Sequence, residues 1–556
     1  RMPHDTFKWK GIDGSEVLTH FITTPEPWNE PGSWFYTYNG KLIPKTVKGT
    51  WDAYSEKQMN KELLIAYGFG DGGGGVNRDM LENRRRIDKI PGLPNLKTST
   101  AAEYFRDLQE TVKNTDQYVH TWDGELYLEY HRGTYTSQAY NKRMNRKMEL
   151  LYRNTEWLTV MNALKMGGLT YARQEELTKG WKHILTDQFH DIIPGSSIHE
   201  VYEDSRKDYE YIQSVAQGVQ EDALSHIIED KKDCYTVFNA SGWKRSEIVT
   251  IPNERAGIYR DEQANELDAQ QAGTVTYVEV KDIPAMGTGT IIFEEKKAEE
   301  TEAEFTICGK NIETPYYSMS MNGYGQITRL YDKIFARDVL PKGERANVFQ
   351  MFEDKPLDND AWDIDIYYKE KMWLIDNIAS IEVIEEGPVR STLRIERKFL
   401  NSTIVQNIHL YNDIPRIDFN SYIDWKEFDI VLKTLFPLDI NAKEATYEIQ
   451  YGNITRSTHE NTSWDLAQFE SCGHKWVDLS EGNYGVSMLN NSKYGHDIND
   501  GLMRLTLLKS GILPNPITDQ EEHNFIYSLY PHKGDFKDSG TVQMAYNLNV
   551  PLYAKL

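Results

Sequence analysis

The sequence predicts a multidomain fold in which the C-terminal part of a parallel-sheet α/β domain is followed by a helical bundle and by large β-sandwich domains. Three observations predict it. Strand-like and helix-like segments alternate over residues 1–120. Apolar residues then recur mostly at helical spacing over residues 135–230. From residue 231 onward, short strand-like segments recur roughly every eight to twelve residues, with Gly, Asn or Pro between them. We therefore expect domains at 1–120, 121–230, 231–305 and 306–556, the last of them a large β-sandwich truncated at its end.

The α/β part is predicted from a hairpin pattern and from two strand–helix pairs. Its expected strands are Thr6–Trp9, Glu16–Ile22, Glu62–Gly68 and Leu96–Thr100, and its expected helices are Asn77–Ile87 and Ala101–Val112. The run Glu62–Gly68 is apolar and ends in glycines, which is typical of a buried parallel strand.

The later elements follow from the same patterns. The bundle helices are expected at 138–166, 174–190 and 198–229. Expected strands of the β-rich part include Thr236–Asn239, Ser246–Ile251, Thr274–Val280, Gly289–Phe293 and Ser391–Phe399. The charged stretch Glu294–Glu304 is expected to be an exposed hairpin or a linker.

Composition excludes several classes of partner. The 556 residues carry a formal net charge of -23, with 85 Asp and Glu against 62 Lys and Arg. Such an acidic surface repels phosphate backbones, so no nucleic-acid partner is expected. The chain has no apolar run of membrane-spanning length, so no membrane partner is expected either. Its three cysteines lie far apart and form neither a zinc pattern nor a disulfide framework, which fits a reducing compartment.

The most informative motif is Asp187-Gln188-Phe189-His190-Asp191-Ile192-Ile193-Pro194-Gly195-Ser196-Ser197. A helical pattern runs into it and Pro194-Gly195 ends that helix. Ser197 and Glu200 have the spacing of a capping box for a second helix. The adjacent pair His190-Asp191 is thus expected at a sharp bend, where the imidazole can bind a metal and the carboxylate can hold a ligand hydroxyl. The alternative is a structural histidine that satisfies free carbonyls at a helix end.

A second motif, Gly68-Phe69-Gly70-Asp71-Gly72-Gly73-Gly74-Gly75, follows the predicted buried strand. Ligands of open parallel sheets bind at the carboxyl ends of strands, so Asp71 is a candidate for proton exchange with a bulky ligand. Gly68, Gly70 and Gly73 also match G-x-G-x-x-G, and a nucleotide-dependent α/β enzyme is therefore an alternative. Two observations weaken this alternative. No acidic residue ends the next predicted strand, where a ribose hydroxyl would need one, and Asp71 itself would repel a pyrophosphate. A flexible glycine turn with a chance aspartate is the third interpretation.

A third cluster, Trp122–Ser137, brings carboxylates, aromatic rings, an arginine and hydroxyls together at the expected junction of the α/β and helical parts. Ligand clefts form preferentially at domain junctions, and these side chains suit a polyhydroxylated ligand.

These motifs carry a resemblance. In order along the chain they are His4–Ser15, Gly70–Gly75, Trp122–Ser137, Phe189–Gly195, Phe352-Glu353-Asp354, Asp360–Asp363, Asn461–Asp465, Phe469-Glu470, Cys472–Glu481 and Tyr484-Gly485-Val486. Together they resemble glycoside hydrolase family 38, the α-mannosidases, and in particular its bacterial and cytosolic branch.

The resemblance implies a retaining α-mannosidase with zinc in the mannose site, and a mutarotase-like sandwich at 306–556. His190 corresponds to one zinc ligand and Asp191 to a carboxylate that binds sugar hydroxyls. His131 and Arg132 match the place where other members put a ring beneath the sugar, and with Tyr130 they are the expected substrate-binding residues. The nucleophile and the other zinc ligands are expected before Arg1.

The implied reaction releases terminal α-linked mannose from oligosaccharides by double displacement. Retention needs two carboxyl groups about 5–5.5 Å apart, one a nucleophile and the other an acid/base. Asp71 is the candidate acid/base. A catalytically dead carbohydrate-binding protein remains an alternative, since no nucleophile is found in the chain.

Further expectations concern the whole protein. The chain opens at Arg1 inside a hairpin pattern and ends abruptly at Leu556, so we expect both flanks to be missing and the fragment alone to be inactive. The resemblance implies a cytoplasmic, bacterial location and allows a homo-oligomer.

Overall fold

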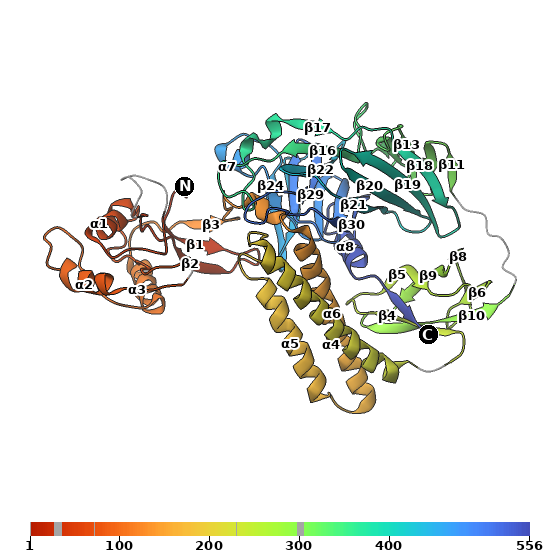
Figure 1. Ribbon diagram of the computed structural model, residues 1–556, viewed down its shortest axis with the longest axis horizontal. Helices are drawn as coiled ribbons and strands as arrows, with labels where there is room; N and C mark the ends of the chain where they lie inside the picture. The colour runs from red at the N-terminus through yellow and green to blue at the C-terminus, as the bar shows by residue number, and fades with distance from the viewer. Residues whose placement is uncertain (1, 27–35, 72, 229–230, 297–304) are drawn as a thin grey trace. The chain divides into compact units, whose positions relative to one another are not determined.

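The computed structural model describes residues 2–26, 36–71, 73–228, 231–296 and 305–556 (Figure 1). Contacts divide the chain into two compact units, Arg1–Leu126 and Tyr127–Leu556. Most of the predicted charged linker at 294–304 lies outside the described residues.

The first unit is built on a small mixed sheet of order β2-β1-β3. Strand β1 (Thr6–Lys10) pairs antiparallel with β2 (Glu16–His20) and parallel with β3 (Thr121–Asp123). Its helices are α1 (Pro44–Ala53), α2 (Arg78–Ile87) and α3 (Ala101–Asn114). The predicted hairpin and the two predicted helices are confirmed.

The predicted strands Glu62–Gly68 and Leu96–Thr100 are wrong. Tyr67 makes an isolated parallel bridge to Gly40, and none of the strands among the described residues falls within the rest of its apolar run. Its partly buried Ile65 and Tyr67 pack on a cluster centred on Leu42 and Met80, which explains the apolar pattern without a sheet. Leu96–Thr100 is a connection that ends at Thr100, the N-cap of α3.

The second unit begins with the short helix η1 (Arg132–Tyr135) and continues with α4 (Ala139–Met166), α5 (Tyr171–Asp187) and α6 (His199–Ile227). Figure 1 shows these three long helices running side by side. Their shared core consists of apolar side chains at helical spacing: Met144, Met148, Tyr152, Leu177, Ile184, Tyr209, Ile212, Ala216 and Val219. The predicted bundle is thereby confirmed, with ends shifted by a few residues.

Two small sheets follow the bundle, in the orders β31-β4-β10-β6-β7 and β5-β9-β8. Their strands are β4 (Cys234–Asn239), β5 (Arg245–Ile251), β6 (Gly257–Arg260), β7 (Glu266–Leu267), β8 (Ala269–Ala272), β9 (Val275–Ile283), β10 (Gly287–Glu295) and β31 (Tyr553–Lys555). The last strand of the chain therefore returns to pair with β4.

Further sheets of the described residues occupy 306–533, in the orders β11-β12-β13-β14-β15, β17-β16-β22-β29-β28-β25 and β18-β19-β20-β21-β30-β27-β26-β23-β24. The first strands are β11 (Thr306–Cys308), β12 (Asn311–Glu313), β13 (Tyr317–Met321), β14 (Ile327–Asp332), β15 (Arg337–Asp338), β16 (Val348–Glu353), β17 (Met372–Leu374), β18 (Ser380–Glu385), β19 (Arg390–Phe399) and β20 (Ser402–Tyr411). The others are β21 (Ile417–Asp424), β22 (Ile430–Pro437), β23 (Glu444–Ile449), β24 (Gly452–Ser457), β25 (Ser471–Cys472), β26 (Trp476–Glu481), β27 (Tyr484–Asn490), β28 (Gly495–Asn499), β29 (Leu502–Lys509) and β30 (Glu522–Lys533). Short helices η2 (Ile366–Glu370), α7 (Ser463–Ala467) and α8 (Thr541–Asn549) lie among and after them.

The sheets of residues 306–533 share one apolar core. It includes Phe349 and Leu432 from the sheet that contains β16, and Ile395, Phe419 and Tyr527 from the sheet that contains β19. Strand alternation sends these side chains inward from both sheets, as in a sandwich. In the described part of the chain, no helix is long and apolar enough to cross a membrane.

Candidate functional site

The His190-Asp191 pair lies in a turn between α5, which ends at Asp187, and α6, which begins at His199. The His190 side chain is 76% exposed, and its Nε2 lies 3.9 Å from Asp191 Oδ2. Its ring is 4.3 Å from that of Phe189. The Asp191 side chain is half-exposed, and Oδ1 accepts a hydrogen bond from Ser196 Oγ at 2.7 Å. The turn thus presents an accessible imidazole beside a carboxylate that is held at one oxygen.

The predicted capping box at Ser197 and Glu200 is wrong. The N-cap of α6 is Ile198, and no side chain caps it. Ser197 Oγ instead donates to Asp191 O at 2.7 Å, and the Tyr202 hydroxyl lies 3.3 Å from the same carbonyl. The serine is used to fix the backbone of Asp191, so it is not available to the helix.

The far end of the turn is packed against the start of α4. Gly195 has φ +87°, and a Cβ there would lie 2.3 Å from Ser137 O. The buried Lys142 ammonium donates to Ser137 O and, at 2.8 Å, to Ile193 O. Ser137 Oγ in turn donates to Ala361 O at 2.7 Å. These contacts tie the turn to both the bundle and the β-rich part of the same unit.

Asp187, at the end of α5, is an unusual carboxyl group. Its side chain is 1% exposed. Burial and then the nearby Asp208 raise the pKa of Asp187 to about 7. The end of α5, three residues before His190, therefore carries a carboxyl group whose pKa lies near neutral pH.

Tyr130 and His131 are exposed on the loop before η1, where His131 has φ +60°. His131 N donates to Asp363 Oδ1 at 2.5 Å, which holds this backbone conformation. Burial, followed by the charges of Asp363 and Glu129, raises the pKa of Tyr130.

Arg132 has different surroundings, because its side chain is buried. Its guanidinium donates to Glu129 O at 2.5 Å and to Ala467 O at 2.7 Å, and it lies 4.3 Å from the Phe469 ring centre. Its donors are directed at main-chain carbonyls and at the Tyr127 hydroxyl, so the geometry gives Arg132 a supporting role for this loop.

Asp71 lies in the first unit, on the glycine-rich loop, with φ +53°. Its carboxylate is exposed and accepts two hydrogen bonds of 3.0 Å, from Tyr38 Oη to Oδ1 and from Asn39 Nδ2 to Oδ2. Gly70 packs tightly against Asn39, since a Cβ there would lie 2.1 Å from Asn39 Oδ1. The loop closes on itself through Phe69 N and Gly75 O at 2.8 Å. Gly72 lies outside the described residues.

The same loop departs from a dinucleotide-binding turn. The fingerprint requires a strand before it and a helix directly after it. Gly68 follows an isolated bridge, and α2 begins only at Arg78. The strand-end position that we predicted for Asp71 is therefore wrong, and Asp71 lies instead on an exposed glycine-rich loop.

Comparison with known families covers most of the chain in three consecutive matches. Residues 1–125 match the glycosyl hydrolases family 38 N-terminal domain, 129–227 the alpha mannosidase middle domain, and 312–517 the family 38 C-terminal domain. The chain belongs to glycoside hydrolase family 38. The predicted resemblance is confirmed.

Curated relatives of this family 38 chain include Alpha-mannosidase G of Dictyostelium discoideum, 32% identical over 100% of this chain and 53% of the relative. Alpha-mannosidase 2C1 of Homo sapiens is 32% identical over 99% of this chain and 51% of its own length, and Alpha-mannosidase of Saccharomyces cerevisiae is 30% identical over 100% and 48%. The chain thus spans about half the length of these relatives. The crystal structure of an alpha-mannosidase from Enterococcus faecalis shares the fold, with a TM-score of 0.80, 17% identity, and coverage of 99% of this chain and 72% of that one.

The metal expected from family 38 has a partial donor set here. His190 offers an exposed imidazole, the ligand type that zinc prefers, and Asp191 lies beside it. Within the described ranges, the group of acidic or histidine side chains that could converge on one ion is Asp268, Glu279 and Asp413, in the β-rich part. His190 therefore fits as one ligand of a site that needs further donors.

Several supporting residues were missed in the sequence. Asp363 stands inside a motif that resembled the family, and Ser196 directly follows another, so both could have been noticed. Tyr38 and Asn39 precede Gly40 at a turn-forming Asn-Gly pair, but only the folded loop brings them to Asp71. The contact between Lys142 and Ile193 joins residues 51 positions apart and leaves no local signal.

Proposed function

We propose that the protein carrying this chain is an α-mannosidase that releases terminal α-linked mannose from oligosaccharides with retention of configuration. The observation that carries the proposal is the exposed His190 beside the anchored Asp191 carboxylate, within a region that matches the alpha mannosidase middle domain. The names of the curated relatives support the same substrate class.

Asp191 is the proposed binder of sugar hydroxyls. Ser196 occupies only Oδ1, and the half-exposed carboxylate keeps acceptor sites for a ligand. Tyr130 and His131 are proposed to contact the sugar from their exposed loop. Arg132 is proposed to position these two residues through its bonds to Glu129 O and Ala467 O.

Asp71 is the proposed general acid/base. Its exposed carboxylate is oriented by Tyr38 and Asn39, so a proton can be exchanged at a defined place. Glycine neighbours leave the room that a bulky glycoside needs around it. We assign no nucleophile among the residues named above.

His190 is the proposed zinc ligand, acting through its exposed imidazole. When bound, zinc would supply Lewis-acid polarisation of sugar hydroxyls. The contribution of this chain is to keep the imidazole accessible. Ser196, Ser197 and Gly195 fix the turn, and the ring of His190 packs against the ring of Phe189.

The decisive test is hydrolysis of an aryl α-mannoside by the full-length protein, with NMR of the first-formed sugar. We expect α-mannose first and loss of activity with a chelator. β-Mannose as the first product would refute retention, and activity indifferent to zinc removal would refute the metal role. His190→Ala should lower bound zinc, measured by atomic absorption, while His226→Ala, an exposed histidine on α6, should not.

The test also separates the alternatives. Binding of mannose oligosaccharides without turnover would favour a catalytically dead carbohydrate-binding protein, and nucleotide retained on purification would favour the nucleotide-dependent enzyme. Cytoplasmic location and homo-oligomerisation are further proposals, to be tested by cell fractionation and light scattering.

A further inference from the structure

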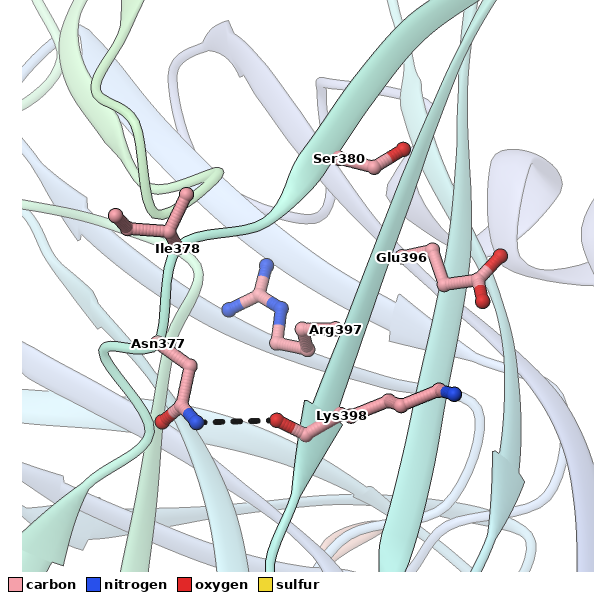
Figure 2. A pocket seen from close by; sticks show the side chains of 6 residues that line it. All are labelled: Asn377, Ile378, Ser380, Glu396, Arg397 and Lys398. Atoms are coloured by element: carbon pink, nitrogen blue, oxygen red, sulfur yellow. Dashed lines mark hydrogen bonds between the residues drawn. The ribbon is translucent and has the colours of Figure 1, made fainter.

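Arg397 occupies an apolar position of the sandwich. Along β19, the side chains of Leu393, Ile395, Arg397 and Phe399 alternate onto the buried face of the strand. Arg397 is only 2% exposed. Its neighbours on β19, Glu396 and Lys398, point to the opposite side (Figure 2).

The Arg397 guanidinium has no hydrogen-bond partner among the described residues. Nε, Nη1 and Nη2 are all buried and unsatisfied. Its surroundings are the ring of Phe349, 5.1 Å from the guanidinium carbon, and Gly325, where a Cβ would lie 2.8 Å from Nη2. Burial lowers the pKa of Arg397 to about 10, so the group still carries its charge at neutral pH.

Other buried cations of the sandwich are treated differently. Lys433 pairs with Glu470, Lys509 with Asp354, and Arg416 with Asp418. Buried charges are stable in proteins when they are paired and hydrogen-bonded. Arg397 departs from this rule, and a partner from outside the chain would restore it.

A pocket of about 640 Å³ opens at this place. It is lined by Asn377, Ile378, Ser380, Glu396, Arg397 and Lys398. Figure 2 shows the guanidinium lying between β19 and the segment that carries Asn377 and Ile378. That segment lies between β17 and β18 and is anchored by Asn377 Nδ2, which donates to Lys398 O at 3.1 Å.

We propose that this pocket binds a small oxyanion, a phosphate or carboxylate group, that accepts hydrogen bonds from Arg397. The planar guanidinium fork matches the spacing of two such oxygens and forms charge-assisted bonds with them. Asn377 and Ser380 supply polar groups at the rim, and the charge of Glu396 is offset by Arg394 at 3.5 Å. Because the guanidinium nitrogens are buried, the head group that reaches them must be small.

This site is independent of the proposed glycosidase function, since it shares no residue with it. Its role would be to stabilise the sandwich when the anion is present. An anion that binds only the folded state raises the unfolding temperature with concentration.

The test is titration of the 556-residue chain with inorganic phosphate and, separately, acetate, at ionic strength held constant with chloride. We expect calorimetric binding of at least one of them and a rise in unfolding midpoint of about 2 °C at tenfold excess over Kd. Arg397→Met should weaken binding at least about tenfold and abolish the thermal shift. Lys443→Met, which removes an exposed cation outside the pocket lining, is the matched control and should retain both.

A second variant guards against misfolding of Arg397→Met. Ser380→Trp should block the mouth of the pocket without touching the guanidinium, and it should abolish binding while circular dichroism stays unchanged. Binding of phosphate alone would identify a phosphate site, and binding of acetate alone a carboxylate site. The proposal is overturned if neither anion binds, or if binding survives both Arg397→Met and Ser380→Trp.

Discussion

Asp71 and Asp191 are both aspartates of proposed catalytic importance, but they are held in different ways. Asp71 lies on a glycine loop, and each of its carboxylate oxygens accepts a hydrogen bond from a side chain of an earlier segment, Tyr38 or Asn39. Asp191 has its backbone bound by Ser197 and one oxygen bound by Ser196, in a turn between two long helices. A group that exchanges protons needs an oriented carboxylate, whereas a group that binds hydroxyls needs free acceptor sites. The number of carboxylate oxygens bound by side chains therefore matches the proposed task of each aspartate: two for the acid/base and one for the hydroxyl binder.

The largest expected effect is that of Asp71→Asn on catalysis. We expect kcat for aryl mannosides with poor leaving groups to fall by about 100- to 1000-fold, because protonation of the leaving oxygen is lost. Substrates with activated leaving groups should be far less affected. Asp79→Asn, on the exposed side of α2, is the control and should match wild type. A normal rate on poor leaving groups would assign the acid role elsewhere.

Gly195→Ala should be the most damaging change to the turn that carries Asp191. The residue has φ +87° and lacks space, so we expect a loss of about 3 kcal/mol in the free energy of unfolding, measured in denaturant. Gly167→Ala is the matched control: φ is +84°, but nothing lies within 4 Å of the added Cβ. It should cost about 1 kcal/mol. Equal losses would mean that backbone strain, and not the Ser137 contact, governs both sites.

Asp187 should make the helix end below His190 sensitive to pH. Its pKa rises from 3.8 to about 7 on folding. Between these values the folded protein keeps a proton that the unfolded chain releases, so this contribution to stability falls as pH rises and levels off above pH 7. Asp187→Asn should remove the fall, gaining about 3 kcal/mol relative to wild type between pH 4.5 and pH 8 in urea unfolding. Asp204→Asn, on exposed α6, should leave the pH profile of wild type, and an unchanged profile in Asp187→Asn would contradict the assignment.

Tyr38→Phe should have the smallest effect, since Asn39 still holds the other oxygen of Asp71. We expect kcat on poor leaving groups to fall about fivefold, in keeping with the loss of one hydrogen bond of about 1 kcal/mol. Tyr118→Phe, 75% exposed in the same unit, should have no effect. A loss as large as that of Asp71→Asn would show that the tyrosine itself takes part in proton transfer.

The sequence predicted the helical parts of these two regions better than their strands. Helices α2 to α6 were predicted because the spacing of side chains along a helix is a local signal, although the cap proposed for the start of α6 was wrong. The strand predicted at Glu62–Gly68 does not form, because an apolar run indicates burial but does not indicate that another strand pairs with it. The predicted cap at Ser197 failed for a similar reason: the serine has two partners available, and tertiary packing selects Asp191 O.

The residue types and their spacing along the chain identified the family, the His190-Asp191 pair at a helix end and the aspartate on the glycine loop, because these are local features of the sequence. Only the tertiary structure decided what surrounds them: Tyr38 and Asn39 at Asp71, Lys142 and Ser137 behind Gly195, the burial of Arg132, and the lack of a partner for Arg397. Such contacts join residues far apart in the chain, and their energies depend on burial and geometry that arise only once the sheets and helices are packed.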